Sequence, residues 1–368
     1  MNSLISLVFQ GLYFENLRNN FVFSPASYQE AIHSLGLCVK DKNLEEIRAA
    51  LELSDTELLT YIKEYKKDIE LENNNYLLYA QEYSGRLNET VTNQLKELSV
   101  ELQSTDFNSP DSVINYVNKL VVENTHGKIS NLLSRQDLSP FTKFIILNCV
   151  YFKKEWAYEF DERRTPEIFY GAEKETQIKF LNKQAWFRYY EDASLDIVEI
   201  PYKQTDVCCY LFVPKNGLLE LTNNFRESYN KINSVKEDCE VNLTVPPFKI
   251  ETTLNLENLT KLAGIKNVFE WNKDWSLVNF DTLMPEAVLK VDRIIQKAYI
   301  DFTKTGTEAA AATAIIINMS GCFIHFNFIP PKIKYIRADK PFLYVLANKN
   351  KKENPLFIGV VNQLDNWS

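Results

Sequence analysis

The sequence has few of the residues and motifs on which most catalytic and metal sites depend. It holds only three histidines, His33, His126 and His325. It contains no H-E-x-x-H metal motif, no G-x-S-x-G nucleophile motif and no phosphate-binding glycine loop. We therefore expect each histidine to be structural or solvated, and we expect no enzyme activity, no catalytic residue, no cofactor and no metal.

An excess of positive charge and long apolar runs are also missing. The chain has 41 basic and 49 acidic residues, a net charge of −8 and no basic block. Binding to nucleic acid needs a basic surface, so that class is disfavoured. The longest apolar runs are far shorter than the ~20 residues of a membrane-spanning helix, so no membrane partner is expected. Glycosaminoglycan binding is disfavoured because the lysines of one helical stretch are interleaved with acids. They are Lys63, Lys66 and Lys67, beside Glu64, Asp68 and Glu70.

The six cysteines form no C-x-x-C pair and have no regular spacing. Free thiols in a reducing compartment are the default interpretation of such a set. Cys208 and Cys209 are adjacent in an apolar segment. In a strand they would place one thiol on each face, and both are expected to be buried and unreactive.

The first twelve residues have no basic region and no small-residue cleavage site. They predict an amphipathic helix with Leu4, Leu7, Val8, Gly11 and Leu12 on one side, in place of a signal peptide. A cytoplasmic protein is therefore expected, with release or secretion by a non-classical route as the alternative.

Helical and strand patterns divide the chain into two parts. Residues 1–130 are expected to be mostly helical, with helices that begin at Ser24-Pro25 and Ser109-Pro110, where a capping residue precedes a proline. Residues 144–152 are apolar on both faces, as in a central strand. Other strands are expected at 197–201, 208–213, 241–245, 342–347 and 356–361. The order predicts an α+β fold built around large sheets, as a single domain over residues 1–368.

Local signals conflict between residues 304 and 331. Gly306 allows a positive φ, and the alanines at 309–312 favour a helix that Thr307 could cap. The isoleucines at 315–317 favour a strand. On these residues alone, a short helix that runs into a buried strand is the simplest interpretation. The conflict also suits a segment that is a loop in one state and a strand in another.

The segment Gly306 to Thr313, G-T-E-A-A-A-A-T, resembles the hinge of the serpin family, the large suicide inhibitors of serine and cysteine proteases. Other blocks resemble the family in the same order along the chain, among them F-V-F-S-P-A-S at 21–27 and L-N-C-V-Y-F-K at 147–153. Further matching blocks lie at 115–133, 187–190, 199–202, 212–215, 247–251, 262–265, 339–342 and 355–359. The resemblance covers about the whole chain.

The resemblance implies a serpin fold of about nine helices around three β-sheets, with an exposed reactive-centre loop at about residues 306–331. It also implies a monomer that is metastable and works by conformational change. A protease cleaves the loop, is held as an acyl-enzyme, and is trapped when the hinge inserts as a strand of the main sheet. A non-inhibitory role as chaperone, carrier or storage protein is the main alternative, and inhibition of a cysteine protease is another.

Two sets of site residues follow from the resemblance. The hinge comprises Lys304, Gly306, Thr307, Glu308, Ala309, Ala310, Ala311, Ala312 and Thr313. The region where the sheet opens comprises Ser24, Ser27, Asn148, Trp156 and Gln296. Two positions depart from the family pattern: Lys304 stands where an acidic residue is usual, opposite Pro246-Pro247, and Gln296 replaces a histidine. We therefore expect a missing ion pair at the hinge and an altered but intact polar cluster.

Counting from the hinge places the reactive bond at Ser320–Gly321, with Met319 and Phe323 as alternatives because the loop is long. These residues favour chymotrypsin-like, cathepsin G-like or elastase-like serine proteases, which would form a covalent complex with the chain. The stretch between Lys304 and Lys332 contains no arginine, no lysine and no aspartate. Trypsin-like proteases and caspases are therefore disfavoured.

Overall fold

The computed structural model describes residues 1–53, 58–67, 71–280, 288–307 and 333–365. Over these residues the chain forms nine α-helices and three β-sheets, which agrees with the α+β prediction. The helices are α1 (Ser3–Glu15), α2 (Pro25–Cys38), α3 (Asp41–Ala50), α4 (Leu58–Lys67), α5 (Glu89–Glu97), α6 (Pro110–Asn124), α7 (Leu218–Asn223), α8 (Phe225–Asn230) and α9 (Glu257–Leu262). No helix in these ranges is long and apolar enough to cross a membrane.

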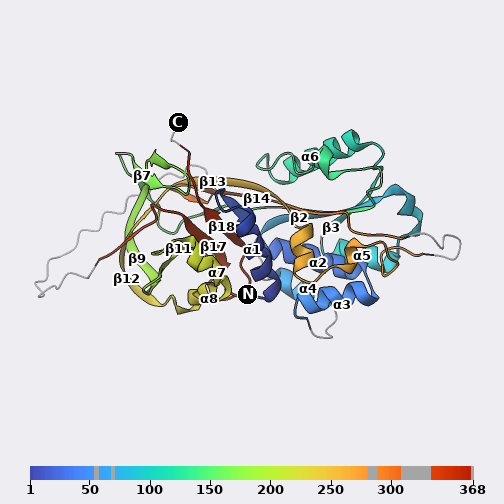
Figure 1. Ribbon diagram of the computed structural model, residues 1–368, viewed down its shortest axis with the longest axis horizontal. Helices are drawn as coiled ribbons and strands as arrows, with labels where there is room; N and C mark the ends of the chain where they lie inside the picture. Colours follow the sequence, from blue (N-terminus) through green and yellow to red (C-terminus); the bar gives the residue numbers. More distant parts are fainter. Residues whose placement is uncertain (54–57, 68–70, 281–287, 308–332, 366–368) are drawn as a thin grey trace, which may run out of the picture.

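A seven-stranded sheet forms the centre of the molecule. Its order is β3 (Val100–Thr105), β2 (Glu72–Ala80), β4 (Phe144–Tyr151), β14 (Arg293–Phe302), β15 (Gly306–Thr307) and β5 (Lys154–Glu155), with β13 (Phe248–Asn255) also paired to β14. Helices α2 to α5 lie on one side of this sheet and α6 lies on the other (Figure 1). The sheet is therefore covered on both faces, which explains why all eight residues of β4 are buried.

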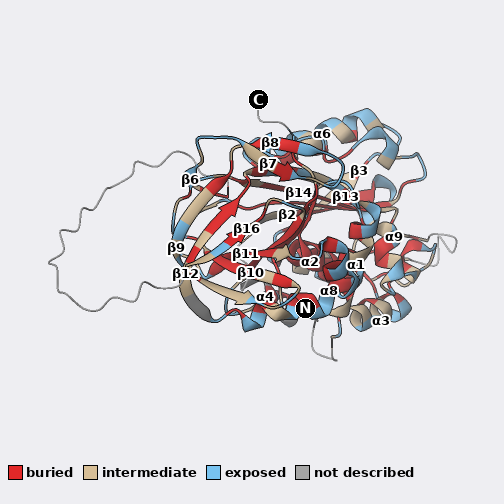
Figure 2. Ribbon diagram, turned by 60° about the vertical axis from the view of Figure 1, so that its left-hand side comes forward, coloured by how far each residue is buried: buried red, intermediate tan, exposed pale blue. Residues whose placement is uncertain are grey.

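A nine-stranded sheet packs beside the first. Its order is β1 (Phe21–Phe23), β18 (Phe357–Val361), β17 (Phe342–Asn348), β11 (Val207–Pro214), β10 (Leu195–Pro201), β9 (Leu181–Glu191), β12 (Glu237–Val245) and β16 (Lys334–Arg337), with β6 (Asp161–Glu162) on β9. The third sheet pairs β7 (Glu167–Tyr170) with β8 (Glu175–Ile178). Buried residues concentrate between the layers (Figure 2).

Two hydrophobic cores occupy these interfaces. One joins α1, α2 and α5 to the lower part of the seven-stranded sheet. The other lies where the upper ends of β13 and β14 meet the nine-stranded sheet, and its aromatic rings pack closely. The Phe248 ring lies 5.0 Å from the rings of both Phe302 and Tyr344. Cys208 belongs to the first core and Cys209 to the second, so the predicted placement of one buried thiol on each face is confirmed.

Ser24 caps α2 as predicted, because its side chain accepts from the backbone N–H of Ser27 and Pro25 occupies the first turn. The same prediction for Ser109 is half wrong. Pro110 does open α6, but the Ser109 hydroxyl donates to Asp106 at 3.1 Å and makes no cap.

The prediction that residues 1–130 are mostly helical misses two strands, β2 and β3. The first half of β2 contains Asn73, Asn74 and Asn75, and three asparagines in a row carry no strand signal. The strand exists because it pairs with β4 over eight residue pairs. Tertiary pairing therefore overrides local propensity in this segment.

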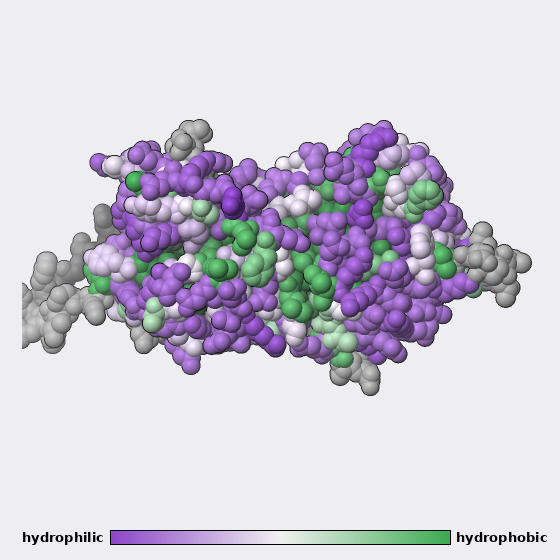
Figure 3. All heavy atoms as spheres, in the orientation of Figure 1, coloured by the Kyte–Doolittle hydropathy of each residue, from purple (hydrophilic) through white to green (hydrophobic). Residues whose placement is uncertain are grey.

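The predicted apolar side of α1 is also partly wrong. Leu4, Val8 and Leu12 are buried, but Leu7 is 51% exposed. Phe14, two helical turns after Leu7, is exposed to the same extent. Apolar side chains are visible on the middle of this face, where α1 lies (Figure 3).

Gly359 offers a test of packing in the second core. It pairs with Tyr344 between β18 and β17, and an added Cβ would lie 2.2 Å from the tyrosine ring. Gly359→Ala is expected to lower the free energy of unfolding by about 1–3 kcal/mol, because a buried ring has to move. Urea unfolding followed by circular dichroism measures the change. Gly85→Ala is the matched control, since nothing lies within 4 Å of its added Cβ. Equal losses in the two variants would contradict this account.

Candidate functional site

Two residues of the predicted hinge, Gly306 and Thr307, form the strand β15 inside the seven-stranded sheet. Thr307 pairs with Phe302 of β14 and with Lys154 of β5, and Gly306 pairs with Glu155. Below this point β14 and β4 pair directly and in parallel, from Arg293 with Ile145 up to Tyr299 with Tyr151. The two central strands therefore part above that pair, and β15 occupies the fork between them.

Gly306 is required here by a close approach of two backbones. An added Cβ would lie 2.3 Å from the carbonyl oxygen of Lys154 and 2.7 Å from the Cα of Glu155. Gly306 does not use the positive φ that glycine allows, since the positive-φ glycines of the described chain are Gly127, Gly217 and Gly264. Only a residue without a side chain fits between β14 and β5 at this position.

Thr307 is fully buried at the end of β15. Its hydroxyl lies 2.5 Å from the hydroxyl of Tyr202, and burial raises the pKa of Tyr202 well above its usual value. Tyr202 therefore stays protonated and can donate or accept in this bond. The pair meets the hydrogen-bonding need of Thr307 inside an apolar core.

Trp156 fixes the chain just before β15. Its indole N–H donates to the carbonyl of Thr303 at 2.9 Å, and its ring stacks on Tyr202 with centroids 4.3 Å apart. The backbone N–H of Trp156 donates to the carbonyl of Thr305 at 3.0 Å. These contacts hold residues 303–307 at the fork from one side.

Lys304 lies within the same turn and is exposed. It lines a surface hollow of about 390 Å³ together with Pro247, Phe248 and Phe302. Lys304 and Pro247 thus face one region, and a lysine and a proline cannot make an ion pair there. Residues 303–307 are held by backbone and aromatic contacts instead.

Farther down the sheet, three side-chain amides form one continuous row across three strands. Asn75 of β2, Asn148 of β4 and Gln296 of β14 are register partners. The amide nitrogen of Gln296 donates to Asn148 at 2.8 Å, and that of Asn148 donates to Asn75 at 2.7 Å. We call this row the amide rung. It crosses the boundary between β4 and β14 directly below the fork.

Helix α2 binds the amide rung from one face of the sheet. The backbone N–H of Ser24 donates to Gln296 at 2.8 Å, and the Gln296 amide donates back to the Ser24 carbonyl at 3.0 Å. Asn148 also donates to the hydroxyl of Ser27. The side chains of Ser24, Ser27, Asn148 and Gln296 are 0–1% exposed. Glutamine thus keeps the polar cluster connected where the family has a histidine.

The structure therefore brings four of the five predicted sheet-opening residues together and places the fifth, Trp156, at the fork. Of the predicted hinge it describes Lys304, Gly306 and Thr307. The remaining hinge and loop predictions lie outside the described residues: Glu308, Ala309, Ala310, Ala311, Ala312, Thr313, Met319, Ser320, Gly321 and Phe323.

Two buried polar residues of the cluster, Glu30 and Asn75, and the half-buried Asn73 were not predicted from the sequence. Glu30 of α2 accepts from Asn73 at 2.8 Å and from Asn75 at 3.2 Å. Glu30 stands three positions after Ser27, on the same face of α2, and this spacing was the available signal. Asn73 and Asn75 were not predicted as part of the cluster because residues 1–130 were expected to be mostly helical.

On the other face of the sheet, a buried lysine binds the segment that follows α6. Lys297 of β14 is 6% exposed, pairs with Glu251 at 2.7 Å and donates to the carbonyl of Ser130, in the segment that follows α6. Ile129 and Leu132 of that segment are buried. The outer face of the β4–β14 boundary is therefore closely covered.

The buried histidine His33 has a structural role. Burial lowers the pKa of His33 to about 3, so it stays neutral, and it packs edge-on against Tyr65 with the ring centroids 5.2 Å apart.

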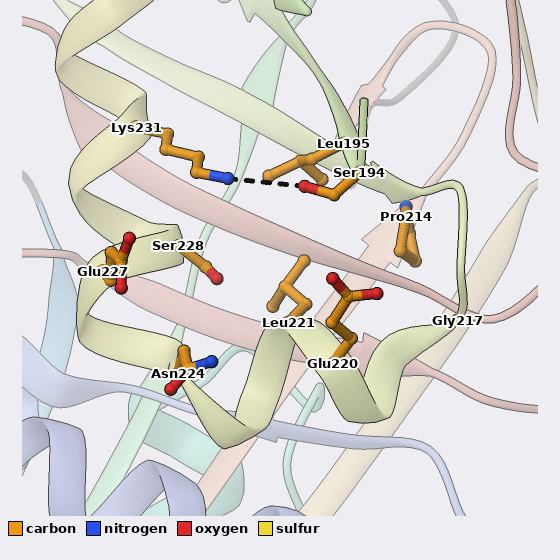
Figure 4. Close-up of a pocket in the computed structure, with 10 residues that line it drawn as sticks. All are labelled: Ser194, Leu195, Pro214, Gly217, Glu220, Leu221, Asn224, Glu227, Ser228 and Lys231. Carbon is orange, nitrogen blue, oxygen red and sulfur yellow. Dashed lines mark hydrogen bonds between the residues drawn. The ribbon is translucent and has the colours of Figure 1, made fainter. Parts of the chain in front are cut away.

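A separate hollow of about 160 Å³ lies beside α7 and α8 (Figure 4). Its cation, Lys231, pairs with Asp192 at 2.7 Å and reaches Ser194 at 3.4 Å. This hollow is smaller than the ~300 Å³ of an ordinary ligand pocket.

Removal of one amide should weaken the whole rung. Asn148→Ala leaves Gln296, Asn75 and Ser27 each short of a buried partner. A loss of about 1–3 kcal/mol in the free energy of unfolding is expected, the usual cost of an unsatisfied buried polar group. Thermal unfolding by calorimetry measures it. Asn350→Ala, at an exposed turn, is the control and should change stability by less than about 0.5 kcal/mol. Equal melting temperatures of the two variants would show that the amide rung does not contribute to stability.

Comparison with known proteins gives one consistent result. The model of the family "Serpin (serine protease inhibitor)" matches residues 2–364. The chain is 30% identical to Iripin-3 of Ixodes ricinus over 287 residues, 76% of this chain and 69% of that protein. It is 28% identical to an antitrypsin of Bombyx mori, covering 91% of this chain and 88% of that one.

Solved structures show the same architecture. Serpin48 of the insect Tenebrio molitor superimposes with a TM-score of 0.81 at 23% identity, over 99% of this chain and 97% of that one. Human thyroxine-binding globulin with thyroxine superimposes with a TM-score of 0.82 at 23% identity, over 98% and 96%. At such identities the likeness is one of fold.

Proposed function

The chain belongs to the serpin family, which indicates a function of the protease-inhibitor type, and we propose that it traps serine proteases by inserting its cleaved loop between β4 and β14. The observation that carries the proposal is the seat of β15. The first hinge residues already occupy the fork of the sheet, paired with β14 on one side and with β5 on the other. Insertion is then the continuation of a strand that has begun.

The strand register supports this continuation. Thr307 is level with Phe302 on one side and with Lys154 on the other. Six residues farther along an inserted strand, Thr313 comes level with Gln296, six residues before Phe302, and with Asn148, six before Lys154. Asn148 and Gln296 are themselves register partners. Both sides therefore bring the Thr313 hydroxyl to the amide rung, where it can replace the bond between the two amides.

The alternation of side chains supports it as well. Residues of an inserted strand that share the parity of Thr307 face α2 and the second core. They are Ala309, Ala311, Thr313, Ile315 and Ile317. The others face α6, where Lys297 and the segment after α6 leave little space; after Glu308 they are Ala310, Ala312 and Ala314, and a larger residue, Ile316, follows only after these. Small side chains on that face allow the strand to enter under its cover.

Insertion is expected to be strongly downhill. About fourteen residues at about 3.3 Å each give a strand of roughly 45 Å with neighbours on both sides. Each new backbone hydrogen bond contributes roughly 0.5–1.5 kcal/mol, and burial of each isoleucine contributes roughly 1.5–3 kcal/mol. The free energy released by this strand drives the trapping of the protease.

The trapped species is an ester between the protease and the loop. The catalytic serine oxygen of the protease attacks the carbonyl carbon of Ser320. The bond from that carbon to the Gly321 nitrogen breaks, and the new amine leaves with a proton from the protease histidine. Insertion of residues 308–320 has to occur before water attacks the ester. Speed of insertion therefore decides between inhibition and simple cleavage.

The proposed targets are chymotrypsin-like, cathepsin G-like or elastase-like proteases, because Met319, Ser320 and Phe323 suit their pockets and no arginine or lysine lies between Lys304 and Lys332. A non-inhibitory role is the second candidate, since Lys304 replaces the usual acidic residue. Thyroxine-binding globulin shows that this fold also occurs in a ligand carrier.

Incubation with chymotrypsin, cathepsin G, elastase and trypsin tests the proposal. A band that survives denaturation, near the summed masses of inhibitor and protease, is expected with one of the first three and not with trypsin. Mass spectrometry of the released C-terminal peptide identifies the bond, which we expect to be Ser320–Gly321. Clean cleavage without an adduct, by every protease of the panel, would favour the non-inhibitory role.

Thr307→Arg tests the seat of β15. A guanidinium cannot be buried without a partner, so the hinge is expected to leave the fork and insertion to slow. Complex formation should fall at least tenfold while cleavage of the loop continues, as measured by densitometry of denaturing gels. Thr305→Arg is the matched control, because this substitution adds the same positive charge at a position before β15 begins. Equal inhibition by both variants would show that the seat does not matter.

A further inference from the structure

The hydrogen bonds of the amide rung all run in one direction. Gln296 has its amide oxygen occupied by the backbone N–H of Ser24, so its nitrogen is the group that faces Asn148. Asn148 then accepts with its oxygen and must use its nitrogen toward Asn75 and Ser27. Asn75 accepts in turn and presents its own nitrogen to α2. The orientation of each amide thus depends on that of the next one.

A row of donors that all point one way needs an acceptor at its end. Glu30 fills this position with a carboxylate oxygen that also accepts from Asn73. Glu30 is 3% exposed, and it lies on α2, the same helix that supplies Ser24 at the other end of the row. The bonds therefore form a closed circuit: α2, β14, β4, β2 and α2 again.

One bond in this circuit spans the boundary where a strand has to enter. It is the bond from Gln296 to Asn148, which joins β14 to β4. If Glu30 could not accept, the amide of Asn75 would gain by turning its oxygen toward Asn73 or Ser27. Its nitrogen would then oppose the nitrogen of Asn148, and the alignment at the boundary would be lost. Glu30 thus acts on the boundary from two strands away.

We propose that Glu30 is a positioning residue that sets the rate at which the sheet opens, by fixing the direction of the amide rung. The inference rests on the proposed function, because an opening sheet is what strand insertion requires. It adds a specific device to it: an acidic acceptor on α2 that holds β2 and β4 as one unit and aligns the bond to β14.

The test measures opening without a protease. A synthetic peptide with the sequence of residues 307–320 is incubated with the intact protein at a temperature well below melting, and uptake of the peptide strand is followed on native gels and by intact-complex mass spectrometry. Glu30→Met removes the acceptor at similar volume. Uptake about tenfold faster than in the unchanged protein is expected, equivalent to about 1.4 kcal/mol.

Two variants separate positioning from general loss of stability. Glu30→Gln keeps an oxygen that can accept from Asn75, so uptake within about threefold of the unchanged protein is expected. Ser34→Ala removes a buried hydroxyl of the same helix, whose bond stays within α2 at the carbonyl of Glu30, and should leave the uptake rate unchanged even if it lowers the melting temperature. Equal acceleration in Glu30→Met and Ser34→Ala would overturn the proposal.

A double-mutant cycle with Asn75→Val provides a second criterion. If the two residues act through one circuit, Glu30→Met in the Asn75→Val background should accelerate uptake by less than about twofold. Additive effects would overturn the proposal. Failure of the proposed function looks different: no covalent complex with any protease would form, while the order of uptake rates among the variants would still decide the role of Glu30.

Discussion

The structure depends on the contact between β4 and β14, two parallel strands that are paired along most of their length and parted at one end. Parallel strands in the middle of a sheet are normally sealed by continuous hydrophobic packing on both faces. Here the seal is interrupted on one face by the amide rung and on the other by Lys297, which reaches past the sheet to Glu251 and to the segment after α6. Polar groups that bond to one another across a boundary can be re-bonded to an arriving strand. A boundary lined only by apolar side chains has no hydrogen bonds that could be replaced in this way.

The two ends of this boundary use different chemistry. At the fork, Trp156, Tyr202 and Phe302 form an aromatic enclosure in which a single hydroxyl, that of Thr307, finds one partner. Lower down, serine, asparagine and glutamine side chains meet with almost no exposure. The enclosure fixes where a strand begins, since only glycine fits between β14 and β5. The amide rung joins the paired strands below the fork by a direct side-chain hydrogen bond.

Much of the fold could be predicted from the sequence. The cap at Ser24, the apolar run of β4 and the opposite faces of Cys208 and Cys209 follow from short-range pattern. Residues 72–80 could not be placed this way, because three asparagines carry no strand signal and their purpose is visible only when α2 and β4 lie beside them. Gly306 was a similar case: its need for glycine arises from the backbone of β5, about 150 residues earlier in the chain.

By itself the sequence determined the family and the α+β order of elements, because these reside in local composition and in ordered blocks along the chain. Only the tertiary structure decided that Asn75, Asn148 and Gln296 share one level, that Glu30 ends their row, and that Trp156 belongs to the fork. The physical reason is that a hydrogen bond between side chains depends on register and direction. Both are set by which strands become neighbours, and residue identity does not contain that information.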